Sequence, residues 1–132
     1  MKNQGRDIDT VIIDLPPAHS DQRGSIQMLM DFPMNSALVI TSEKGSVRAN
    51  HYHKKGDHYC YLASGQIEYH YRPAGNKDTP KVVTIKPGQM FYTPPMVEHA
   101  MKFLDDSVFY VFSNSDREQS NYEADVVRIQ LI

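Results

Sequence analysis

The stretch RANHYHKKGDHYCYLASG, residues 48–65, holds three of the six histidines of the chain. His51 and His53 lie two residues apart, and His58 follows a Lys-Lys-Gly-Asp segment. The surrounding residues include many aromatic and apolar side chains, which is typical of strands. Residues two apart in a strand point to the same side, so His51 and His53 are expected to face together. We expect the Lys-Lys-Gly-Asp segment to reverse the chain, so that His58 opens a partner strand within reach of His53.

Short runs of the same kind recur along the whole chain, about one every ten residues, with glycine, proline and aspartate turns between them. The expected strands are 10–15, 24–30, 37–41, 47–52, 58–63, 66–72, 81–85, 89–93, 100–103 and 107–113. Only residues 116–126 are a candidate helix. This pattern indicates an all-β sandwich or barrel with antiparallel pairing.

Length and composition indicate one globular domain, residues 1–132. A formal net charge of −2 gives no electrostatic basis for binding nucleic acid or an anionic membrane. The single cysteine, Cys60, allows no internal disulfide and fits a reducing compartment. Charges are scattered through the first twenty residues and no stretch is long enough to cross a bilayer. We therefore expect a cytoplasmic protein.

A fourth histidine comes from a distant part of the chain. The segment PPMVEHAM, residues 94–101, places His99 behind a Pro-Pro corner at the start of another expected strand. His99 can meet the earlier histidines at one point only if the sheet closes on itself. The sequence therefore predicts a small barrel.

These residues resemble the two sequence motifs of the cupins. The first motif matches at Gly45, His51, His53, His58 and Gly65, with His58 in the place of a glutamate. The second matches at Gly88, Pro94 and His99, whereas Met96 and Phe103 stand where the motif has glycine and asparagine. The resemblance implies the all-β cupin fold, a double-stranded β-helix with a jelly-roll-like barrel.

Four segments carry a narrower resemblance: DQRGSI (21–26), VRANHYHK (47–54), YTPPMVEHAM (92–101) and SDREQSNYEADVVRI (115–129). They look like the sugar-nucleotide cupins, which are 3,4-ketoisomerases of dTDP-4-keto-6-deoxyglucose and, in fold, relatives of the dTDP-4-keto-sugar 3,5-epimerases. The resemblance implies an isomerase or epimerase that moves a proton α to the carbonyl of a nucleotide-linked keto-deoxy sugar. His51 and His53 would handle the proton. The residues that would bind the substrate are Arg23, Arg48, Lys54 and Tyr92, with Arg48 beside a diphosphate.

The chain departs from those ketoisomerases at three places. They have glutamine in the place of His58 and work without a metal, they have a tyrosine in the strand that here reads ALVIT (37–41), and they have glycine in the place of Ala49. His58 moves the pattern toward the metal-binding cupins. Asp57 takes the same ligand position instead if the register of the turn shifts by one residue.

Neutral imidazoles suit divalent transition metals, and a set of nitrogen donors in a barrel leaves positions open for a substrate. We therefore expect zinc, iron, nickel or manganese at His51, His53, His58 and His99, and no organic cofactor. Such a metal would occupy His51 and His53, so another group would have to carry the proton. The candidates, among which the sequence does not choose, are Tyr52, Tyr61, Tyr92 and Glu98.

Two other functions stay open: a metal-dependent cupin enzyme of the dioxygenase kind that acts on another small molecule, and a cupin that binds a ligand without catalysis. The apolar run Val11–Ile13 lies near the N-terminus, where such barrels often lend a strand to a neighbour, so we expect a homodimer.

Overall fold

The computed structural model describes residues 7–115 and 118–132. In these residues the all-β class expected from the sequence is confirmed, because strands account for nearly all of the regular structure. The elements, in chain order, are β1 (Ile12–Ile13), β2 (His19–Asp21), β3 (Gly24–Ile26), β4 (Ser36–Ser42), β5 (Val47–His53), β6 (His58–Ser64), β7 (Ile67–Pro73), β8 (Lys81–Ile85), β9 (Met90–Thr93), β10 (Val97–Phe103), β11 (Ser107–Ser113), α1 (Gln119–Asp125) and β12 (Val126–Arg128).

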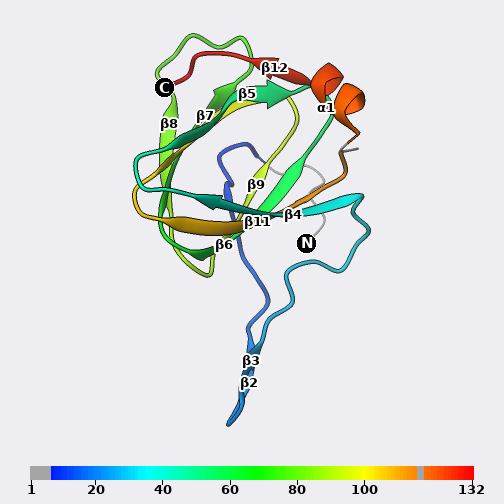
Figure 1. Ribbon diagram of the computed structural model, residues 1–132, viewed down its shortest axis with the longest axis vertical. Coiled ribbons are helices and arrows are strands. Elements are labelled where there is room, and N and C mark those ends of the chain that lie inside the picture. The colour runs from blue at the N-terminus through cyan, green and yellow to red at the C-terminus, as the bar shows by residue number, and fades with distance from the viewer. Residues whose placement is uncertain (1–6, 116–117) are drawn as a thin grey trace.

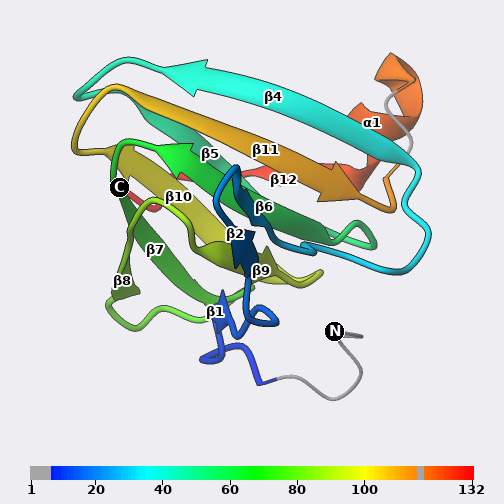
Figure 2. The same cartoon turned by 90° about the horizontal axis from the view of Figure 1, so that it is seen from below.

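Ten of the strands form two antiparallel sheets that face one another across the core (Figures 1 and 2). One sheet has the order β1-β9-β6-β11-β4 and the other the order β12-β5-β10-β7-β8. Strands that follow one another in the chain fall in different sheets at several points, as in a jelly roll. The expected jelly-roll-like barrel is therefore confirmed.

The core lies between the two sheets and follows from the alternation of side chains along each strand. In β7 the side chains of Ile67, Tyr69 and Tyr71 are buried, whereas those between them are half-buried on the outer face. These three side chains belong to the main core cluster. Its buried members are Val11, Cys60, Leu62, Ile67, Tyr69, Tyr71, Ile85, Phe91, Val97, Phe103, Phe109 and Val111. Each large apolar side chain buried in this way stabilises the fold by about 1.5–3 kcal/mol before entropy is counted.

A second apolar cluster covers the outer face of the first sheet. Tyr59 and Tyr92 belong to it, and they alternate along β6 and β9 with Cys60 and Phe91 of the main core. Side chains from residues 15–34 pack over these tyrosines, and the rings of Tyr59 and Tyr92 are 4.6 Å apart. Tyrosines of this cluster therefore point away from the interior of the barrel.

The prediction that the two histidine strands, β5 and β6, form a hairpin is wrong. β5 pairs with β10 and β12, whereas β6 pairs with β9 and β11, so the two strands lie in different sheets. The segment between them crosses from one layer to the other, and its N–H groups need acceptors that no partner strand supplies. Asp125 supplies them: its backbone oxygen accepts from Lys54 N at 2.9 Å and its carboxylate from Lys55 N at 2.7 Å.

The short helix α1 lies within the candidate segment 116–126, of which residues 116 and 117 fall outside the described residues. The side chain of Glu118 caps it by accepting from Asn121 N. Strand β12 follows at once and was not expected, because its three residues are too short to give a pattern. No helix among the described residues is long and apolar enough to span a membrane.

Strands β2 and β3 form a separate two-stranded arm that projects from the barrel (Figure 1). The sequence predicted one strand over 24–30, whereas β3 ends at Ile26 and β2 was not expected. The side chain of Ile26 is 75% exposed and that of Met28 is 46% exposed. The arm and the segment just after it therefore each present an apolar side chain to the outside of this chain.

Candidate active site

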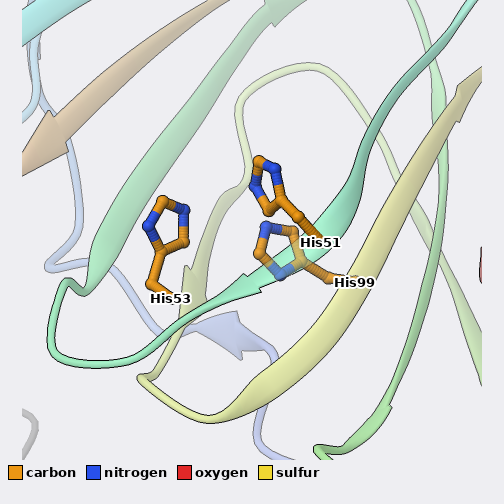
Figure 3. A group of neighbouring side chains, drawn as sticks. All are labelled: His51, His53 and His99. Atoms are coloured by element: carbon orange, nitrogen blue, oxygen red, sulfur yellow. The ribbon is translucent and has the colours of Figure 1, made fainter. Parts of the chain in front are cut away.

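Three histidines meet inside the barrel (Figure 3). His51 and His53 lie on one face of β5, and His99 on β10 is the cross-strand partner of His51. The ring of His51 is centred 4.7 Å from that of His53 and 4.8 Å from that of His99. One nitrogen from each ring lies within 4.8 Å of the others. The predicted convergence of the late histidine with the His-x-His pair is therefore observed.

A bulge in β5 aims His51 into this group. The pairing of β5 with β10 shifts register between His99 and Ala100, and the extra residue on β5 is Asn50. Ala49 and Asn50 have φ values of 71° and 54°, in the left-handed region that costs most residues about 1–2 kcal/mol. The side chain of Asn50 holds the chain end by accepting from the N–H groups of Leu131 and Ile132. Bulges of this kind often lie beside functional sites, where they redirect a side chain.

Two of the three imidazoles are anchored through Nδ1. The Nδ1 atom of His99 lies 3.0 Å from the backbone oxygen of Val97, and that of His53 lies 3.1 Å from a carboxylate oxygen of Asp125. Burial lowers the pKa of His99 to about 4; the bond to Val97 opposes this shift and the nearby His53 adds to it. His99 is therefore neutral at pH 7, with Nδ1 protonated and Nε2 available as an acceptor.

His58 lies beside the three-histidine group but is not part of it. It opens β6 in the opposite sheet, and its ring packs edge-on against that of His53 with the centroids 4.2 Å apart. The side chain is buried and lines the same cavity as His51 and His99. The predicted four-histidine set is thus brought together as three candidate ligands with a fourth imidazole next to them.

His51, His58 and His99 line a cavity of about 210 Å³, whereas His53 does not reach its wall. Its other walls are largely apolar, and the full lining is Ile40, Arg48, Ala49, His51, His58, Cys60, Phe91, Thr93, His99, Met101, Phe109, Val111 and Tyr122. Pockets that enclose a whole drug-sized ligand measure roughly 300–1,000 Å³. The cavity therefore suits one ring-sized group, with the remainder of any larger ligand outside.

Several predicted site residues do not reach this cavity. Tyr61 and Tyr92 belong to the cluster on the outer face of the first sheet, and the hydroxyl of Tyr92 donates to Asp57. Glu98 precedes His99 and so points to the opposite face of β10. Its carboxylate accepts from Arg72 Nε at 2.8 Å and from Gly75 N at 3.1 Å. The geometry gives these three residues packing and pairing partners outside the histidine group.

The three basic side chains predicted to bind the substrate differ in whether they reach the cavity. Arg48 lines it, held by Ser42 Oγ at 2.7 Å, whereas Lys54 is exposed at the corner after β5. Arg23 lies on the projecting arm, where its side chain is 89% exposed and pairs with Asp21 at 2.6 Å. Of the three, only Arg48 contacts the cavity of its own chain.

Helix α1 contributes two residues that sequence reasoning did not single out. Tyr122 lines the cavity, with its ring centred 5.8 Å from that of His53, and Asp125 contacts His53 directly. Both lie in the tail segment 115–129 that carried part of the resemblance. The motif indicated that the segment matters, but its distance in sequence from His53 hid the contact.

Residues 38–113, more than half of the chain, match the family model described as a cupin domain. The chain belongs to the cupin family. The match spans the histidine strands β5, β6 and β10, so the family and the site rest on the same part of this cupin. A search of the curated proteins gives no significant match.

Solved structures share the fold of this cupin at low sequence identity. A variant of the 3,4-ketoisomerase QdtA from Thermoanaerobacterium thermosaccharolyticum, in complex with TDP-4-keto-6-deoxyglucose, is 19% identical with a TM-score of 0.71, over 89% of this chain and 85% of that one. A 3,4-ketoisomerase from Helicobacter canadensis is 18% identical with a TM-score of 0.73, over 89% and 88%. The dTDP-4-dehydrorhamnose 3,5-epimerase from Sulfolobus tokodaii is 21% identical with a TM-score of 0.62, over 75% and 66%.

Proposed function

We propose that this cupin is an isomerase or epimerase that acts on a nucleotide-linked keto-deoxy sugar by proton transfer α to the carbonyl. The observation that carries the proposal is the group of two buried imidazoles and one half-buried imidazole at a cavity of ring size, with Arg48 on its wall. The likeness in fold to sugar-nucleotide ketoisomerases and to an epimerase supports the choice of substrate.

The chemistry needs no oxidant or reductant. A base removes the proton from the carbon next to the carbonyl, the electron pair moves to the carbonyl oxygen, and an enediolate forms. A 4-keto sugar becomes a 3-keto sugar when a proton returns to C4 and the hydroxyl proton moves from O3 to O4; an epimer forms when the proton returns to C3 from the other face. Imidazoles that are neutral at working pH can take and return these protons, a role that contributes about 10²–10⁴-fold. Arg48, which lines the cavity, would bind an anionic group of the substrate.

We propose a divalent transition metal at His51, His53 and His99. In a tetrahedral site two nitrogen ligands at about 2.1 Å from the ion lie about 3.4 Å apart, so the present separations of up to 4.8 Å would have to shorten by at most about 1.4 Å. The Nδ1 anchors of His53 and His99 are the outer partners that metal-binding histidines require. A metal held there would stabilise negative charge on the substrate oxygen as a Lewis acid. His58, which lines the cavity outside this group, would then handle the proton.

The three-histidine group also favours a second candidate function, a metal-dependent cupin enzyme of the dioxygenase kind that acts on another small molecule. The apolar walls around Phe91 and Phe109 fit such a substrate as well as a deoxy sugar. The two functions differ in whether the reaction requires a metal and consumes oxygen. The assay described next distinguishes them on these two points.

Incubation with dTDP-4-keto-6-deoxyglucose is expected to give an isomerised or epimerised product, and in deuterated water the sugar should take up deuterium next to the carbonyl. NMR of the sugar ring follows both. The assay is run with chelated protein and with protein reloaded with zinc, iron, nickel or manganese. The absence of both exchange and product with all forms of the folded protein would refute the proposal, and oxygen uptake with another substrate would favour the dioxygenase-like function.

We also propose that the protein is a homodimer in which the arm of one copy packs on a second copy. The apolar side chains of Ile26, on the projecting arm, and of Met28, just after it, are exposed in the single chain, and Arg23 in the turn of the arm does not line the cavity (Figure 1). Light scattering is expected to give a dimer, and Ile26→Glu to shift it toward monomer, whereas Val82→Glu, at a half-exposed position on β8, should leave it intact. A monomeric wild-type protein would contradict this.

A further inference from the structure

Three hydrogen-bond donors converge on the carboxylate of Asp125, the last residue of α1. Its Oδ1 accepts from Lys55 N at 2.7 Å, and its Oδ2 accepts from Gly56 N at 3.1 Å and faces His53 Nδ1 at 3.1 Å. The side chain of His53 is 1% exposed and that of Asp125 is 16% exposed. The contact is therefore shielded from water, and it joins the tail of the chain to the histidine at the end of β5.

Only a carboxylate can serve all three donors, because it accepts through both oxygens and donates through neither. An asparagine of the same shape would turn its NH₂ group toward at least one N–H. If that group faces His53, the ring can pair with it only by moving its proton from Nδ1 to Nε2. The chemistry of Asp125 therefore sets which nitrogen of His53 carries the proton.

Gly56 makes this contact possible. A Cβ atom at position 56 would lie 2.8 Å from Asp125 Oδ2 and would overlap Ser115 Oγ. The backbone angle of Gly56 is one that other residues adopt, so the requirement for glycine comes from space alone. A methyl group there would displace the carboxylate from His53 without altering either residue.

We propose that Asp125 is a positioning residue that holds His53 in the tautomer with Nδ1 protonated, so that Nε2 stays bare for the group that His53 forms with His51 and His99, and that Gly56 preserves the space for this contact. In its consequence for turnover the inference rests on the proposed function. Its consequence for metal binding rests on the proposed metal site. Its consequence for the tautomer rests on neither, because the tautomer is a property of the protein without metal or substrate. Loss of an outer partner of this kind lowers metal affinity or activity by about 10–100-fold.

The first test compares Asp125→Asn with the wild-type protein by nitrogen NMR of the imidazole rings, in metal-free protein at neutral pH. The signals of His53 are assigned by their loss in His53→Gln. The wild-type ring is expected to have a protonated Nδ1 and a bare Nε2. In Asp125→Asn the amide can face the ring with either its oxygen or its NH₂ group, so part of the population is expected to carry the proton on Nε2 instead. Glu123→Gln, which removes an exposed carboxylate of α1 that pairs with Arg128, is the matched control and should keep the wild-type pattern. An unchanged tautomer in Asp125→Asn overturns the proposal.

A second variant keeps the proposal testable if Asp125→Asn fails to fold. Gly56→Ala keeps the carboxylate, and it is expected to weaken Zn²⁺ binding by about 10–100-fold in calorimetry and to disturb the His53 tautomer. Unchanged zinc affinity and tautomer would overturn the role given to Gly56. If the wild-type protein turns over no sugar nucleotide while the His53 tautomer changes in Asp125→Asn, the proposed function fails and this inference stands. If turnover is normal and both variants keep the wild-type tautomer, the inference fails and the function stands.

Discussion

Replacement of His99 by Gln is expected to lower both the metal affinity and the turnover of the proposed reaction by more than 100-fold. His99 is 3% exposed, and its Nε2 is the acceptor that β10 brings to the group on β5. Loss of an outer partner already costs about 10–100-fold, so loss of a ligand should cost more. Glutamine keeps most of the volume, which limits damage to the core. Elemental analysis of the reloaded protein and zinc titration measure the effect on metal binding, and the NMR assay measures the effect on turnover.

His70→Gln is the matched control, because His70 lies one strand away on β7 but points to the outer face and bonds to Glu68. It should retain full activity and metal content. If His99→Gln keeps its metal but loses turnover, the imidazole serves proton transfer rather than ligation. Wild-type metal content together with wild-type turnover in His99→Gln would contradict the proposed site altogether.

The period of two in a strand predicted the core of the site. It placed His51 and His53 on one face, and the motif around His99 supplied the third ring, all of which the structure bears out. The same rule shows why two other candidates lie elsewhere. Tyr61 stands three residues after His58 and Glu98 stands directly before His99, so in regular strands both must face away from those histidines. Their placement could have been read from the sequence.

The pairing of the strands could not be read from the sequence. A short turn between two strands usually makes a hairpin, and nothing within residues 54–57 shows that β5 and β6 part into different sheets. The acceptors that hold this crossing come from Asp125, about seventy residues later in the chain. The bulge at Ala49 and Asn50 is hidden for a similar reason, because pairing on both sides of β5 imposes backbone angles that these residues do not favour.

Replacement of Arg72 by Met is expected to lower the free energy of unfolding by roughly 3 kcal/mol at pH 7. The side chain of Glu98 is 7% exposed, and without Arg72 its charge stays buried with the Gly75 N–H as its hydrogen-bond donor. Removal of one member of a buried ion pair costs about 3–5 kcal/mol, and the partial exposure of Arg72, at 19%, places this pair at the lower end. Urea unfolding measures the difference.

The cost should depend on pH with a definite sign. Burial alone would raise the pKa of Glu98, but Arg72 and the Gly75 N–H outweigh it and hold the pKa below its ordinary value of 4.5. The native pair therefore stabilises the fold above pH 4.5, and this contribution is lost as the pH falls through the lowered pKa. In Arg72→Met burial prevails and the pKa rises, so protonation of Glu98 relieves the buried charge. The destabilisation should shrink between pH 7 and pH 4.

The double variant Arg72→Met/Glu98→Gln should recover most of the lost stability, because it leaves no unpaired charge in the interior. The single variant Glu98→Gln separates the pairing role from the catalytic role that the sequence allowed. If Glu98 serves the fold alone, this variant turns over substrate at the wild-type rate and is only modestly less stable. If it folds normally but loses turnover by 100-fold or more, Glu98 acts in the reaction, and its carboxylate must then leave Arg72 to reach the substrate. A destabilisation of Arg72→Met that is equal at pH 7 and pH 4 would exclude the buried charge as its cause.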